Sequence, residues 1–148
     1  MIYTKMTKKA MIFAYNAHSG QFDKSGIPYI MHPFHVAEAM KDEDSTTVAL
    51  LHDTIEDTKY TKEDLLNEGF PKYIVDAIVS LSRESNESYM DYIRRVKQNN
   101  LAKIVKLADL EHNSDLSRKD TVTEEDLKRV KKYNKARDIL NKEDTWTW

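Results

Sequence analysis

The sequence contains no cysteine, little glycine or proline, and no long apolar run. The lack of cysteine excludes disulfide bonds and thiolate metal sites, so imidazole and carboxylate groups would have to hold any metal ion. Three glycines and three prolines are few for a β-protein with many tight turns, and they favour a bundle of helices. No apolar stretch approaches the roughly 20 residues that cross a bilayer, and the N-terminus lacks the apolar segment of a signal peptide. We therefore expect a cytoplasmic protein without a membrane partner.

Charge of neither sign dominates the chain. It has 23 basic and 25 acidic residues and a formal net charge of -2. This balance gives no general electrostatic reason to bind nucleic acid, and we expect no such partner, although a local basic pocket is compatible with it. The 148 residues suffice for one sizeable core but are few for two typical domains, so residues 1–148 are expected to form a single domain. An oligomer is compatible with all of these observations.

Helix signals are frequent and predict an all-α fold. Segments that begin at Thr61, Ser88 and Thr123 fit a capping box with Asp in its fourth position, which marks the start of a helix. Apolar residues recur at helical spacing in several segments, and each such face needs a neighbour to pack against. With boundary errors of ~2–4 residues, helices are expected at about 5–18, 29–41, 45–55, 61–68, 71–82, 88–98, 101–112 and 123–141.

Four side chains that can bind metal or transfer protons crowd into six residues: His52, Asp53, Glu56 and Asp57. They follow the apolar stretch 48–51, so we expect them to lie against a core, where an unpartnered carboxylate costs several kcal/mol. A bound cation would remove that cost. If one helix continues through all six positions, residues four apart share a face, and His52 aligns with Glu56 while Asp53 aligns with Asp57.

Two distant residues fit as further ligands of the same ion. His32 lies upstream, and Asp109 directly follows the apolar stretch 104–108. Two imidazoles and two carboxylates suit manganese, iron or zinc better than calcium, which prefers six to eight oxygen ligands. Open positions on such an ion could receive water and a phosphoryl oxygen, which is the arrangement that hydrolytic metal sites require.

Each piece also has a simpler structural interpretation. A lone His-Asp pair often arises by chance, and the acidic pair that follows it could begin a surface loop. His32 could be a core or capping histidine, and Asp109 could simply pair with Lys106 or Arg118. His35, one turn beyond His32, is the main rival ligand, and a structural role in a helix is expected of it. The joint occurrence of two acidic pieces directly after apolar runs favours the metal site.

The order His32, His52–Asp53, Asp109 resembles the HD superfamily of metal-dependent phosphohydrolases. Three longer blocks, at residues 17–33, 50–58 and 106–113, resemble the hydrolase domain of RelA/SpoT-type alarmone enzymes. The resemblance covers about residues 5–140. It implies an all-helical bundle of the HD-domain type that removes the 3′-pyrophosphate of guanosine tetraphosphate or pentaphosphate with a divalent metal, Mn²⁺.

The resemblance also implies roles for individual residues. The implied metal ligands are His32, His52, Asp53 and Asp109. The resemblance makes Glu56 and Asp57 the groups that position or activate the attacking water. The implied contacts to the nucleotide are Lys24, Asn113 and Tyr133. Lys24 could serve as a point-charge partner for phosphate, Asn113 lies one turn beyond Asp109, and Tyr133 has core packing as its simpler interpretation.

Two positions depart from the family pattern. Asp23 stands where these hydrolases usually have arginine, and Leu110 stands where a basic residue commonly follows the last ligand aspartate. A lost guanidinium and an added anion should weaken binding of a polyphosphorylated guanosine. Two alternatives therefore stay open: a phosphohydrolase acting on another nucleotide or a phosphate monoester, and a non-catalytic regulatory protein that binds nucleotide or metal. The retained acidic pair argues against a pure sensor, which has no need to orient water. The tail with Trp146 and Trp148 is expected to need a packing surface.

Overall fold

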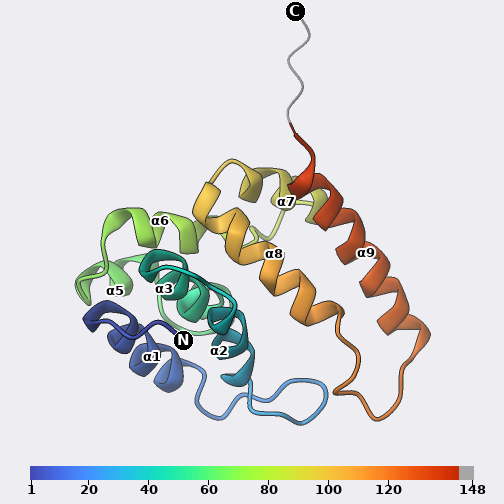
Figure 1. The fold of residues 1–148 in the computed structure, drawn as a ribbon, viewed down its shortest axis with the longest axis horizontal. Coiled ribbons are helices and arrows are strands. Elements are labelled where there is room, and N and C mark those ends of the chain that lie inside the picture. Colours follow the sequence, from blue (N-terminus) through green and yellow to red (C-terminus); the bar gives the residue numbers. More distant parts are fainter. Residues whose placement is uncertain (144–148) are drawn as a thin grey trace, which may run out of the picture.

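The computed structural model describes residues 1–143, and the regular secondary structure of these residues is helical (Figure 1). In chain order they are α1 (Lys5–Ala17), α2 (Met31–Glu38), α3 (Glu43–Leu51), α4 (Thr54–Asp57), α5 (Lys62–Asn67), α6 (Lys72–Ser80), α7 (Tyr89–Lys97), α8 (Asn100–Ser114) and α9 (Glu124–Asn141). Within residues 1–143 the extended structure is limited to an isolated antiparallel bridge between Phe22 and Pro28. The expectation of an all-α fold is confirmed. Trp146 and Trp148 lie outside the described residues.

Several helices begin where their capping residues predicted. Thr61 and Asp64 form a reciprocal capping box at the start of α5, and Thr123 and Asp126 do the same at α9. Ser88 caps α7 by accepting a backbone N–H of its first turn. Each cap satisfies N–H groups that have no partner inside the helix, which contributes about 1 kcal/mol.

The predicted helix at 45–55 is wrong in one respect, because the structure breaks it at His52 and Asp53. The His52 Nδ1 atom lies 2.6 Å from the Ala49 carbonyl oxygen, and the Thr54 hydroxyl donates to the Leu51 carbonyl at 2.7 Å. These side chains occupy carbonyl groups that backbone N–H groups would use in a continuing helix. The chain turns at this point and starts α4, so the two polar residues lie at a corner instead of along one face.

The corner lies in the interior because α3 is the central helix. Every residue from 45 to 51 is buried, and α3 packs against α1, α2, α6 and α8. A helix that is buried all round carries apolar side chains on every face, and Leu50 and Leu51 illustrate this with no exposed surface. Burial of each such side chain contributes about 1.5–3 kcal/mol. The core therefore fixes the end of α3, and with it the position of His52.

The remaining helices enclose this centre from the other side. α8 runs diagonally between the group around α3 and the long helix α9 (Figure 1), and α9 also packs against α7. None of the helices in residues 1–143 is both long and apolar enough to cross a membrane.

Candidate metal centre

Three of the predicted ligands come from three different helices and meet in the interior. His32 belongs to the first turn of α2, His52 ends α3, and Asp109 lies in the middle of α8. One potential ligand atom of each lies within 4.8 Å of the others, and all three residues are buried. The Nε2 atoms of His32 and His52 lie 2.7 and 3.4 Å from the same Asp109 oxygen, Oδ1.

Asp53 completes the set of four. Its Oδ2 atom lies 3.0 Å from His52 Nε2 and 3.7 Å from His32 Nε2. The Tyr29 hydroxyl donates to the same oxygen at 2.6 Å and holds the carboxylate in place. Tyr29 was not singled out from the sequence, where nothing local distinguishes it from a core tyrosine.

The histidine tautomer at His52 fits a metal ion. Because Nδ1 faces the Ala49 carbonyl, it carries a proton, and in the neutral ring this leaves a lone pair on Nε2. Nε2 is buried and has no hydrogen-bond partner among the described residues. Although burial opposes charge on the ring, the Asp53 and Asp109 carboxylates beside Nε2 raise the pKa of His52 well above its ordinary value, and a divalent ion between the four side chains would take the place of the Nε2 proton. His32, His52, Asp53 and Asp109 could therefore hold an ion.

Asp109 also forms the ion pair that the simpler interpretation suggested. The Lys106 ammonium lies 2.8 Å from Oδ2, while Oδ1 faces the histidines, so the two interactions use different oxygens. Although burial opposes charge on both groups, the pair holds the pKa of Lys106 well above, and the pKa of Asp109 well below, their ordinary values. Asp109 is therefore an anion that is ready to bind a cation.

The acidic pair lies beside Asp53. Ligand atoms of Asp53, Glu56 and Asp57 all lie within 4.8 Å of one another. Glu56 accepts the backbone N–H of Arg83 at 2.7 Å, and burial, together with the charges of Asp53 and Glu56, raises the pKa of Asp57 to about 6. The structure thus brings Glu56 and Asp57 to the edge of the candidate metal centre, although not by the continuous helix that we expected.

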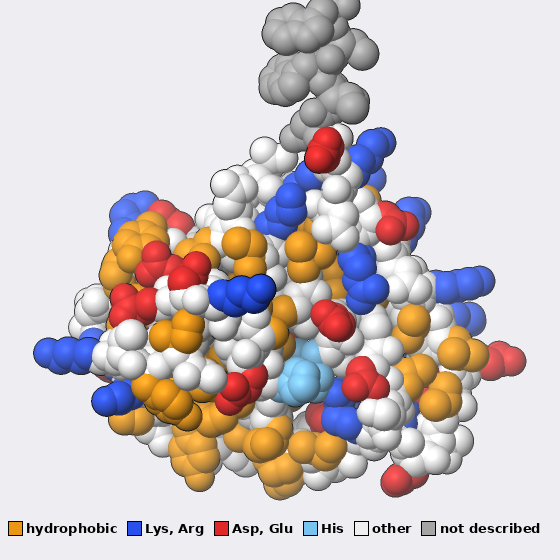
Figure 2. All heavy atoms as spheres, viewed as in Figure 1, with side chains coloured by type: hydrophobic (Ala, Val, Ile, Leu, Met, Phe, Trp, Pro, Cys, Tyr) orange, Lys and Arg blue, Asp and Glu red, His pale blue; other side chains and the backbone are white. Residues whose placement is uncertain are grey.

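The rival ligand His35 is not part of this group. Its ring stacks on the His112 ring with centroids 4.1 Å apart, as expected for a structural residue. Figure 2 shows histidine side chains reaching the surface in a hollow between α2 and the far end of α8, with acidic and basic side chains around it. The candidate ligands His32, His52 and Asp109 themselves are buried.

A cavity of about 360 Å³ adjoins the centre, and Tyr29 lies on its wall. The three predicted nucleotide contacts, Lys24, Asn113 and Tyr133, all line it. Asn113 also donates to Asp109 Oδ1 at 3.1 Å, which places its amide between the cavity and the candidate metal ligands. The structure thus brings the three residues together, and their contact with a nucleotide stays a prediction.

Three basic residues in this cavity were not singled out as nucleotide contacts from the sequence: Arg118, Lys119 and Arg129. They lie in the loop before α9 and on α9 itself, far along the chain from Lys24, and only the fold brings them near it. Lys119 and Arg129 both pair with the buried Asp126 carboxylate, so part of their charge is already neutralised.

The two departures from the family pattern have different structural consequences. Asp23 lines the cavity, but its Oδ1 atom accepts the backbone N–H groups of Ser25 and Ile27 at 2.8 and 3.0 Å and so closes the loop. These two hydrogen bonds partly compensate the negative charge of Asp23. Leu110 has no exposed surface and packs in the core. The position does not line the cavity, so the lack of a basic residue there does not change the cavity lining.

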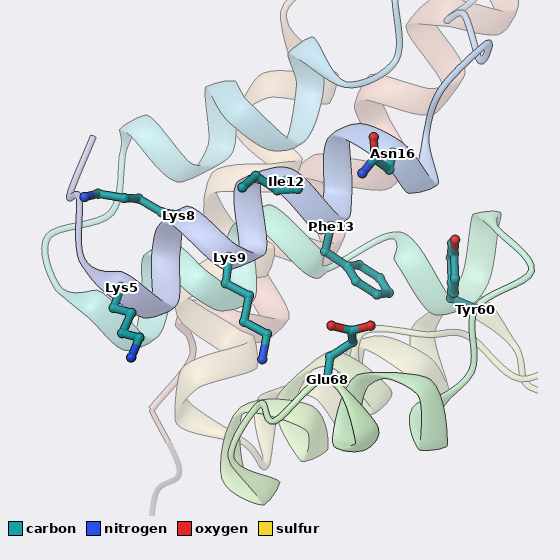
Figure 3. Close-up of a pocket in the computed structure, with 8 residues that line it drawn as sticks. All are labelled: Lys5, Lys8, Lys9, Ile12, Phe13, Asn16, Tyr60 and Glu68. Atoms are coloured by element: carbon teal, nitrogen blue, oxygen red, sulfur yellow. The ribbon is translucent and has the colours of Figure 1, made fainter.

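A larger cavity, of about 590 Å³, lies between α1 and the region around α5 (Figure 3). Lysine side chains of α1 border it, and Figure 3 shows Phe13, Tyr60 and Glu68 turned toward one another inside it. It offers one carboxylate and no imidazole, so it lacks the donor set of a metal site. The donor atoms, and not the size of the cavity, identify the candidate functional site.

Comparisons with known proteins bear on the family and the fold of the chain. A family model described as "HD domain" matches residues 10–132. The chain is 38% identical over 123 residues to a GTP pyrophosphokinase of Myxococcus xanthus, covering 72% of this chain and 16% of that protein. It is 37% identical over 116 residues to a guanosine-3′,5′-bis(diphosphate) 3′-pyrophosphohydrolase of Haemophilus influenzae, covering 69% of this chain and 17% of that protein.

A third relative is the bifunctional (p)ppGpp synthase/hydrolase SpoT of Escherichia coli K12, with 34% identity over 124 residues, 74% of this chain and 18% of that protein. The chain therefore spans less than one fifth of the length of these curated relatives. A solved structure, described as a metazoan ortholog of SpoT that hydrolyzes ppGpp, has a TM-score of 0.77 and 23% identity. It covers 95% of this chain and 88% of its own, which shows that the two share a fold.

Proposed function

The chain belongs to the HD domain family, and on that premise we propose that it is a metal-dependent hydrolase that removes the 3′-pyrophosphate of guanosine tetraphosphate or pentaphosphate. The observation that carries the proposal is the joint placement of two features: four buried ligand side chains and a cavity with basic and amide groups beside them. The names of two relatives, a guanosine-3′,5′-bis(diphosphate) 3′-pyrophosphohydrolase and a (p)ppGpp synthase/hydrolase, support the choice of substrate.

We propose Mn²⁺ as the ion, because two imidazoles and two carboxylates form a mixed donor set that suits a borderline divalent metal. Such an ion, when bound, lowers the pKa of water and neutralises charge that develops on a transferring phosphoryl group. The protein holds the donors in advance, since Ala49 fixes the His52 tautomer, Tyr29 fixes Asp53, and Lys106 keeps Asp109 ionised.

The acidic pair would handle the proton of the attacking water. Asp57, with its pKa raised to about 6, can accept a proton near neutral pH, and general bases act best when their pKa is near the working pH. Glu56 is fixed by the Arg83 N–H and can orient the water with its second oxygen. On the substrate side, Lys24 and Arg118 would face phosphate oxygens, and Tyr133 would pack against the nucleoside.

One observation favours a second candidate, a phosphohydrolase that acts on a less charged nucleotide or a phosphate monoester. The cavity is lined by four basic residues, Lys24, Arg118, Lys119 and Arg129, but also by three acidic ones, Asp23, Asp115 and Asp126. This near balance attracts a polyphosphate less strongly than a purely basic cavity does.

A product-resolved assay separates the two candidates. The Mn²⁺-loaded protein is incubated with guanosine tetraphosphate and with a panel of nucleoside monophosphates, and pyrophosphate and orthophosphate are measured separately. We expect pyrophosphate from guanosine tetraphosphate. Orthophosphate from a monophosphate alone would support the second candidate, and no turnover of any substrate would support a regulatory protein.

Two variants and a matched control assign the roles. His52→Ala should lose both metal and activity, whereas Glu56→Gln should keep the metal and lose activity. Glu63→Gln makes the same chemical change on the exposed side of α5 and should behave as the wild type. Equal activity in all three variants would show that the activity does not come from this site.

A further inference from the structure

A line of three hydrogen bonds connects the cavity to the candidate metal centre. An Arg118 guanidinium nitrogen lies 2.6 Å from His112 Nε2, His112 Nδ1 lies 2.6 Å from His32 Nδ1, and His32 Nε2 lies 2.7 Å from Asp109 Oδ1. The planes of the His32 and His112 rings differ by 22°, with centroids 4.8 Å apart, so a nitrogen of each ring can face the other within the ring plane. Neither His112 nor Arg118 is among the four candidate ligands.

The direction of every bond in this line follows from its two ends. An arginine can only donate, so His112 Nε2 must accept and the His112 proton must lie on Nδ1. His112 then donates to His32 Nδ1, which places the His32 proton on Nε2. His32 Nε2–H donates to the Asp109 carboxylate, which can only accept. All three hydrogen bonds are therefore satisfied in this arrangement of protons.

The same line cannot persist when a cation takes the lone pair of His32 Nε2. Ligation there moves the His32 proton to Nδ1, so His112 Nδ1 must accept and the His112 proton must move to Nε2. Two donors, the Arg118 N–H and the His112 Nε2–H, would then face each other at 2.6 Å. Each ring carries one proton in both arrangements, so the exchange needs no net proton.

We propose that metal loading reverses the His32–His112 hydrogen bond and expels Arg118 from His112 into the adjoining cavity, where it becomes a phosphate ligand. Arg118 is poorly held in its present position, since its buried Nε atom has no partner among the described residues. It already lines the cavity together with Lys24 and Asn113. Metal binding would thus place a guanidinium in the cavity. This group would compensate for the family arginine that Asp23 replaces. This inference rests on the proposed metal role of His32.

The tautomers can be observed directly. Long-range ¹H–¹⁵N spectra of the imidazole rings are recorded for the metal-free protein and for the protein loaded with Zn²⁺, a diamagnetic probe. We expect the His112 proton on Nδ1 without metal and on Nε2 with Zn²⁺. The same His112 tautomer in both states, with Zn²⁺ bound, would overturn the exchange while leaving the proposed metal centre intact. A wild-type protein that takes up neither Zn²⁺ nor Mn²⁺ would instead overturn the proposed function, and the exchange with it.

Metal affinity gives a second test, because the two residues should act with opposite sign. His112→Phe removes the acceptor of the His32 Nδ1–H and should weaken Mn²⁺ binding about 10–100-fold in a chelator competition. Arg118→Met removes the competing donor and should strengthen binding about tenfold. The matched controls are His35→Phe, which keeps a ring stacked on His112, and Lys119→Met, which removes the same charge from the same loop.

Both controls should shift the affinity by about twofold or less, which is the effect of a distant screened charge. If Arg118→Met and Lys119→Met strengthen Mn²⁺ binding equally, the effect of Arg118 comes from its charge alone. That result would overturn the proposed exchange. Arg118→Met should also weaken binding of a guanosine diphosphate probe to the metal-loaded protein about tenfold, although it binds metal more tightly. Tighter metal binding combined with unchanged binding of that probe would overturn the proposed role of Arg118 in the cavity.

Discussion

The ion pair between Lys106 and Asp109 allows a prediction of how much stability the protein loses when one partner is removed. Their side chains are 12% and 5% exposed, and the ammonium lies 2.8 Å from Asp109 Oδ2. Lys106→Met keeps much of the length and apolar volume of the side chain but leaves the carboxylate without its cation. Removing one partner of a buried pair costs about 3–5 kcal/mol, because the remaining charge is left desolvated. In a chain of this size, that loss lowers Tm by roughly 6 to 20 °C.

The chain offers a closely matched control. Lys72 and Asp76 form a pair with the same nitrogen–oxygen distance, 2.8 Å, but their side chains are 76% and 42% exposed. Exposed pairs of this kind contribute about 0.2–1 kcal/mol, so Lys72→Met should shift Tm by ~4 °C or less. The assay is thermal and urea unfolding of both variants in a chelating buffer.

Addition of Mn²⁺ extends the test. The ion should supply Asp109 with a new positive neighbour, so the Tm difference between Lys106→Met and the wild type should shrink when Mn²⁺ is present. Equal losses in Lys106→Met and Lys72→Met would refute the view that burial sets the strength of this pair. A Lys106→Met defect that Mn²⁺ leaves unchanged would refute the placement of the ion next to Asp109.

Three further variants probe the surroundings of the centre. Tyr29→Phe removes the hydroxyl that donates to Asp53 at 2.6 Å, and it should weaken Mn²⁺ binding about 10–100-fold in a chelator competition. An affinity within about twofold of wild type would show that the hydroxyl is dispensable. Asp23→Asn keeps the acceptor oxygen that closes the loop but removes the anion, so KM for guanosine tetraphosphate should fall while kcat stays the same, and a raised KM would contradict the expected repulsion. The Thr123 N–H, together with Lys119, holds the pKa of Asp126 below its ordinary value. Ionised Asp126 therefore stabilises the fold at any pH above the pKa that this carboxyl has in the unfolded chain. This stability is lost as the pH falls toward the lower pKa that the carboxyl has in the folded protein. The free energy of unfolding of wild type should therefore fall more steeply below about pH 4 than that of Asp126→Asn, and parallel curves would refute this contribution.

The parts of the fold that could be predicted are those that local chemistry decides. Thr61 and Thr123 mark helix starts because a capping hydroxyl needs only the next three residues. The break after α3 could not be predicted from apolar spacing, since it depends on His52 and Thr54 turning their side chains back onto carbonyl groups of their own helix. The helical period alone predicts a continuous segment there.

The candidate site divides in the same way. His32 and Asp109 lie 77 residues apart in the chain. They were connected in advance by their residue types, by the apolar runs before the acidic residues and by the resemblance to the HD superfamily. The placement of Arg118 and Arg129 in the cavity depends on how the loop before α9 folds back toward Lys24, which no spacing in the sequence indicates. Long-range packing, and not local preference, therefore decides which basic residues could meet a substrate.

The central claim is that His32, His52, Asp53 and Asp109 bind one divalent ion. The most direct test is an anomalous difference map from crystals of the wild-type protein soaked in Mn²⁺. We expect a single strong peak at about 2.0–2.3 Å from His32 Nε2, His52 Nε2 and one oxygen of each aspartate. A map with no peak there, and with His52 Nε2 bonded instead to a protein donor, would contradict the claim.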